Sequence, residues 1–183
     1  MREAKASMSR AVLVRVVDAE LGECLTGIVA GVAADVLVLA TVDDLGLSGF
    51  TGRLQVVGTA VLVLLWTVNL LVARPRLLRA FRAAVPVDDP AILRQGAEQR
   101  RHLRRGRVRV AAFVLIATLG GAYLLHWPLF GLGWQLILAL GVVHTRWTAL
   151  GWERRNGVRL WKPPLSAVGR EEWRRSPYFV ARA

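Results

Sequence analysis

Cysteine is nearly absent from this chain, since Cys24 is the one thiol among 183 residues. A single cysteine excludes an intramolecular disulfide framework and a cysteine-ligated metal cluster. The phosphate-cradling GxxxxGK[ST] loop, the HExxH zinc motif and any extended run of paired acids are also missing. We therefore expect neither a metal nor a cofactor.

Lysine is almost as scarce, because Lys5 and Lys162 are the only lysines among 25 basic residues and all the others are arginine. Arginine suits bidentate contacts with anions, but it is also the basic residue that GC-rich coding favours. We attribute the imbalance mainly to coding bias.

Hydrophobic residues make up 54% of the chain although 21% of it is charged. The two properties coexist because they are segregated into four apolar runs and the segments between them. The runs cover residues 26–42, 54–73, 108–125 and 129–150. Each is long enough for a helix to cross a hydrocarbon core of about 30 Å. We predict an all-α polytopic membrane protein, with four transmembrane helices in two antiparallel hairpins.

The charges between the runs predict an orientation. Residues 74–109 hold eleven arginines and three acids, and residues 146–183 hold nine basic residues and three acids. The connection 43–53 carries two acids and one base. Because short basic segments stay on the cytoplasmic side, we expect a multi-pass protein of the cytoplasmic membrane with both termini inside. Charges interrupt the apolar stretch that precedes the first run, so we expect this run to be retained and not cleaved as a signal peptide.

The chain then divides into five segments with distinct expected roles. Residues 1–25 form a cytoplasmic amphipathic segment, which either lies in the interface or extends the first span, with Gly22 as a plausible bend. Asp89-Pro90 is typical of a helix start. The segments are 1–25, the hairpin 26–73, the basic loop 74–107 with a helix over 90–105, the hairpin 108–150 and the basic tail 151–183. The aromatic end of the tail, SPYFVARA, is expected to be a docking sequence and not a fold.

Asp35 is the one acidic residue inside a predicted span. An ionised carboxylate at the centre of a membrane helix costs about 2.5–3.5 kcal/mol. Gly27, Gly31 and Asp35 are spaced by four, so they share one helix face, and small residues of this kind mark close helix packing. Asp35 is either a proton- or cation-binding group, or a packing residue whose hydrogen bonds come from Thr118 or Gln135.

Other polar and small residues inside the spans are expected to join helices. Asn69 and Gln135 suit hydrogen bonds between helices, and Ala117 with Gly121 forms a second small-residue face. The string Gly46-Leu47-Ser48-Gly49 matches the GxSG string of rhomboid-type serine proteases. We reject that interpretation, because the chemistry needs a histidine base against the serine in a membrane cavity. Here the string lies in the expected external turn, and only His126 is expected on the same side.

The basic loop and the tail are candidate contact surfaces at the inner face. Each positive charge near an anionic membrane surface contributes about 1 kcal/mol. We expect the contacts with anionic lipid head groups or partners to come from Arg100, Arg101, Arg104, Arg105, Trp161 and Trp173. Aromatic residues do not interleave the arginines, so nucleic acid is not an expected partner.

Three functions are compatible with these features. The leading hypothesis is a non-enzymatic membrane protein that acts by association, as an accessory, assembly or scaffold subunit, with other membrane subunits or copies of itself as partners. The alternative is a small oligomeric transporter or channel that uses Asp35 as a proton- or cation-linked site. A third hypothesis is a membrane enzyme that acts on an anionic lipid through the inner arginines and His144.

Overall fold

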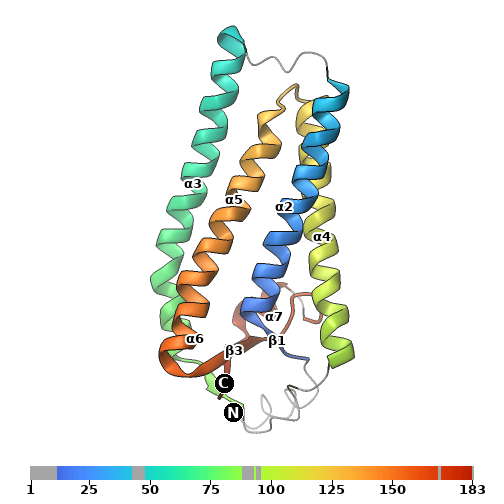
Figure 1. Cartoon of the computed structure of the whole chain (residues 1–183). Helices are drawn as coiled ribbons and strands as arrows, with labels where there is room; N and C mark the ends of the chain where they lie inside the picture. Colours follow the sequence, from blue (N-terminus) through green and yellow to red (C-terminus); the bar gives the residue numbers. More distant parts are fainter. Residues whose placement is uncertain (1–11, 43–47, 88–92, 94–95, 169, 183) are drawn as a thin grey trace.

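A computed structural model describes residues 12–42, 48–87, 93, 96–168 and 170–182. Most of these residues are helical, and four helices are long and apolar enough to cross a membrane. The chain therefore has the character of a multi-pass membrane protein. The helical prediction holds for the bulk of the molecule, but it missed a small sheet at one end of the bundle (Figure 1).

The elements follow one another along the chain with bounds that differ from the predicted spans. The helices are α2 (Val16–Thr41), α3 (Gly49–Arg82), α4 (Gly96–Tyr123), α5 (Leu129–Thr145), α6 (Gly151–Asn156) and α7 (Arg170–Arg175). The strands are β1 (Val14–Arg15), β2 (Val85–Pro86), β3 (Val158–Lys162) and β4 (Phe179–Arg182). A π-helical turn, Arg146–Leu150, joins α5 to α6.

Two predicted helix boundaries are absent. The helix α2 runs from Val16 through Gly22 without a break, so residues 16–25 of the amphipathic segment extend the first span. The helix predicted over 90–105 and the third span form one helix from Gly96, since the arginine-rich stretch between them contains good helix formers and no proline. Its predicted start at Asp89-Pro90 lies outside the described residues.

The four long helices do not pack as two self-contained hairpins. The helices α2, α4 and α5 contact one another extensively, whereas α3 packs against α5 and shares few contacts with α2. In Figure 1, α3 stands at the side of the bundle. Much of its surface is consequently left for lipid or for another protein.

The sheet joins three parts of the chain that are far apart in sequence. Its strand order is β1-β3-β4-β2. Strand β3 pairs antiparallel with β1 (Val14 opposite Lys162) and with β4, and β2 pairs parallel with β4. Pro86 is tolerated because β2 is an edge strand. We call this end of the bundle the sheet end.

A compact apolar core lies beneath the sheet. It consists of Val16, Val17, Phe81, Ala149 and Leu160, all less than 7% exposed. The Phe81 ring meets Tyr178 edge-on at 4.9 Å between centroids and Trp152 at 5.8 Å. The expectation that SPYFVARA is a docking sequence and not a fold is therefore wrong: its aromatic residues are part of this packing, and Phe179 is 3% exposed.

Candidate functional site

A cavity of about 440 Å³ lies at the sheet end between α2, α4 and the chain that follows β3. Most of its wall is apolar, and the side chains that contribute this surface include Val14, Val16, Leu103, Val110 and Leu165. Its charged lining groups are Glu20, Glu23, Arg109 and Lys162. An apolar cavity with a few convergent polar groups is the usual form of a small-ligand site.

Lys162 is held in this wall by two aromatic rings. Its Nζ lies 3.7 Å from the centroid of the Trp173 ring and 4.5 Å from that of Tyr178. Burial lowers the pKa of the Lys162 ammonium, and the negative charge of Glu20 opposes that shift. Burial, and then the same carboxylate, raise the pKa of Tyr178 to about 12. The cation–π contacts therefore hold a buried cation where water is scarce.

Glu20 and Glu23 come from one side of α2, because they are three residues apart. The Thr145 hydroxyl of α5 donates a hydrogen bond of 2.9 Å to Glu20 Oε2. The Glu23 carboxylate lies against Gly106 of α4, where a side chain would collide with it. Gly22 similarly leaves room for the Arg107 guanidinium. Both acids are therefore positioned by neighbouring helices.

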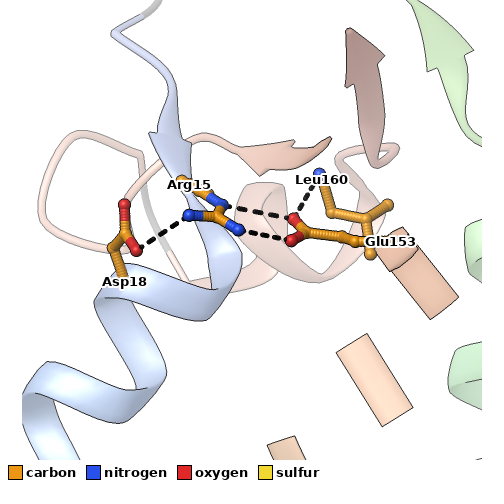
Figure 2. A network of polar contacts seen from close by, with 4 residues as sticks. All are labelled: Arg15, Asp18, Glu153 and Leu160. Carbon is orange, nitrogen blue, oxygen red and sulfur yellow. Dashed lines mark hydrogen bonds and ion pairs between the residues drawn. The ribbon is translucent and has the colours of Figure 1, made fainter. Parts of the chain in front are cut away.

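An ion pair joins Arg15 of β1 to Glu153 of α6 (Figure 2). Arg15 Nη2 donates to Glu153 Oε2 at 2.6 Å, and the Leu160 amide donates to Glu153 Oε1 at 2.7 Å. Glu153 is 4% exposed, whereas Asp18, which accepts a bond from Arg15, has a side chain that is 53% exposed. The bond to Glu153 is the main reason that the pKa of Arg15 is raised. This network fixes the wall from which Val14 and Lys162 line the cavity.

Asp35, Gln135 and Thr118 lie together inside the bundle. Gln135 Nε2 donates to Asp35 Oδ2. Gly131 lies beside both Asp35 Oδ1 and Thr118, so a side chain at this position would collide with them. Thr118 is 0% exposed, and its hydroxyl has no hydrogen-bond partner among the described residues. The structure thus places three of the four predicted intramembrane polar residues in one group.

Asn69, the fourth, lies elsewhere. It is exposed on α3, and its side chain makes no hydrogen bond within the described part of the chain. The bundle as described offers it no partner helix, so its role in joining helices stays a prediction.

The three glycines predicted to pack are at helix contacts. A side chain added at Gly27 would come within 2.6 Å of Leu138 and 2.9 Å of Val110. One at Gly31 would come within 2.8 Å of Gln135, and one at Gly121 within 2.9 Å of Phe130. Gly27, Gly31 and Gly121 are buried and Ala117 is half-buried.

The predicted surface contacts separate into two groups. The four arginines of the basic loop that are expected to contact anions are exposed on α4; they are Arg100, Arg101, Arg104 and Arg105. Trp161 lies within β3, and Trp173 faces Lys162. The tryptophans are consequently engaged within the fold, while the arginines remain accessible for contact with anions.

The histidines do not assemble into one site. His102 shares a hydrogen bond of 2.7 Å with Ser166 at the cavity wall, whereas His126 is exposed in the turn before α5. His144 is half-buried on α5, and its Nε2 is buried without a partner among the described residues. In the described residues, no group of three or more His, Cys, Asp or Glu is arranged to hold a metal ion.

Sequence reasoning missed the cavity and the groups that line it. From sequence, Glu20 and Glu23 are expected only as part of the amphipathic segment 1–25, and Lys162 only as part of the basic tail 151–183. The available signal was the rarity of lysine, since Lys162 stands where arginine is used almost everywhere else.

Comparison with protein-family models, with curated proteins and with solved structures finds no match for this chain.

Proposed function

We propose that the protein acts by association within the cytoplasmic membrane, as an accessory, assembly or scaffold subunit, and that α3 is its associating helix. The observation that carries this proposal is the exposed Asn69 carboxamide within the apolar surface of α3. Lipid tails offer it no hydrogen bond, and a buried polar group without a partner is costly. A second helix placed on this surface would satisfy it.

The partner that fits this surface best is α3 of a second copy. A carboxamide both donates and accepts hydrogen bonds, so Asn69 complements the same residue across a two-fold axis. Leu65 and Val72 flank Asn69 at helical spacing and are 64% and 52% exposed, so they would provide the apolar contact around it. Hydrogen bonds of this kind between membrane helices contribute about 0.6–2 kcal/mol.

Disulfide cross-linking in native membranes tests the association. In a Cys24→Ala background, Leu65→Cys and Val72→Cys should each give a covalent dimer under mild oxidation. Leu71→Cys is the matched control, because Leu71 is 61% exposed at similar depth on the opposite side of α3. Adding Asn69→Leu should reduce the cross-linking several-fold. Equal cross-linking at Leu71 would indicate random collision, and absence at all three positions would overturn the second-copy proposal.

A transporter or channel that uses Asp35 is the second candidate. Its support is the Thr118 hydroxyl, which is buried beside the Asp35 carboxylate and has no hydrogen-bond partner in the part of the chain that the structure describes. Against it, Asp35 already accepts a hydrogen bond from Gln135, and the cavity at the sheet end does not include Asp35. Association therefore remains the better-supported function.

A further inference from the structure

The cavity at the sheet end has features that neither the association of α3 nor the overall fold requires. Its lining combines a mostly apolar wall with two acids, Glu20 and Glu23, and two bases, Arg109 and Lys162. In the described part of the chain no ion pair joins either acid to either base; the ion pairs found there all involve Arg15. Two acidic and two basic side chains thus border one space without a salt bridge between them in the described residues.

The depth of the cavity matches the boundary between lipid head groups and acyl chains. Arg109 and Val110 are consecutive in α4 and both line the cavity. Exposed arginines precede this point, and an apolar run follows it. Because arginines reach toward head groups while apolar residues stay in the hydrocarbon, an occupant would have its polar part beside Arg109 and its apolar part beside Val110.

We propose that this cavity binds a zwitterionic phospholipid whose head group carries a primary ammonium, of the phosphatidylethanolamine type. The ammonium donates hydrogen bonds to Glu20 and Glu23, and the phosphate accepts them from Arg109 and Lys162. The start of the acyl chains contacts Val14 and Val110. This site is independent of whether the chain associates through α3.

Two other lipid classes fit the lining less well. An anionic lipid would bring its phosphate beside two carboxylates without supplying a positive charge for them. A choline head group has no N–H to donate to the carboxylates, and it binds best on aromatic faces. The aromatic faces present, Trp173 and Tyr178, are already covered by Lys162 Nζ.

Native mass spectrometry of the full chain in mild detergent tests the proposal. The probes are phosphatidylethanolamine, its N-methyl and N,N-dimethyl derivatives, phosphatidylcholine and phosphatidylglycerol, all with the same acyl chains. We expect saturable binding of one phosphatidylethanolamine, about tenfold tighter than phosphatidylcholine, because hydrogen bonds to charged groups are lost on methylation. Affinity should fall stepwise with each methyl group. Equal affinity for all lipids, or tightest binding of phosphatidylglycerol, would overturn the proposal.

Substitutions test whether the preference for phosphatidylethanolamine over phosphatidylcholine arises in the cavity. The double variant Glu20→Gln with Glu23→Gln should bind phosphatidylethanolamine and phosphatidylcholine equally. Glu171→Gln is the control, since Glu171 is exposed on α7 and does not line the cavity, and it should keep the preference. A folded double variant that retains the wild-type preference would contradict the site. If the double variant does not fold, the methylation series on the unmodified protein decides alone.

Discussion

Asp35 illustrates how one residue acquires a role from its neighbours. The sequence marks it as a charge inside a span, and the structure supplies Gln135 as a donor to it. An asparagine at this position would also accept the hydrogen bond from Gln135, and it would avoid the cost of an ionised group in hydrocarbon. The hydrogen bond by itself thus gives no reason for a carboxylate over an amide.

Replacing Asp35 separates a packing role from a transport role. We expect Asp35→Asn to leave thermal stability in detergent unchanged or slightly higher, because the amide oxygen still accepts from Gln135. Asp35→Leu should lower the free energy of unfolding by about 1–3 kcal/mol, since the Gln135 amide then loses its acceptor. If Asp35→Asn abolishes proton or cation flux in proteoliposomes while expression and stability persist, the transporter function replaces association.

At the scale of elements, the two ends of the bundle are closed differently. At the sheet end, the Arg15–Glu153 pair and the paired strands join the first and last parts of the described chain. At the other end, α3 meets the turn before α5 through Gln55 Nε2, which donates to the His126 carbonyl at 3.1 Å. Loss of the Arg15–Glu153 pair should cost more stability than loss of the Gln55 hydrogen bond, because Glu153 is almost completely buried.

Removing one partner of that pair should destabilise the protein. Glu153→Gln leaves Arg15 without its main counter-charge, and we expect a loss of about 2–4 kcal/mol, at the lower end of values for buried pairs because Arg15 is partly exposed. Asp18→Asn alters the exposed half of the same network (Figure 2) and should cost less than about 1 kcal/mol. Thermal unfolding in detergent compares the Glu153→Gln and Asp18→Asn variants. Equal losses of stability would contradict the conclusion that Glu153 is the main partner of Arg15.

At the scale of the whole molecule, positive charge is concentrated at one end. Arg82 of α3, Arg104 of α4 and Arg155 of α6 are all exposed and belong to the sheet end. The opposite end, around His126 and Trp127, carries little charge. The positive-inside rule then predicts that the sheet end faces the cytoplasm.

Labelling of single cysteines in sealed inverted vesicles tests this orientation. In a Cys24→Ala background, Arg155→Cys should react with a membrane-impermeant maleimide added outside inverted vesicles. Leu125→Cys, which is exposed at the opposite end, should react only after the vesicles are opened. The reverse pattern would place the sheet end outside and remove the basis for a cytoplasmic head-group site.

The four apolar helices could be predicted from sequence because hydrophobic length is a local property of the chain. The sheet could not, because strands as short as Val14–Arg15 carry no periodicity and form only when β3 and β4 are brought to them. The same limit applies to the cavity: Glu20, His102 and Lys162 are distant in sequence and meet only after α2 and α4 pack.

The sequence by itself determined that the chain has four segments long and apolar enough to cross a membrane and which segments are basic, since both follow from composition along the chain. It also marked Asp35 as a costly charge, because its surroundings in sequence are apolar. Only the tertiary structure decided that Gln135 is its partner, that the aromatic tail is folded and that a charged cavity lies beside the sheet. These depend on contacts between distant residues, which hydrophobic pattern alone does not specify.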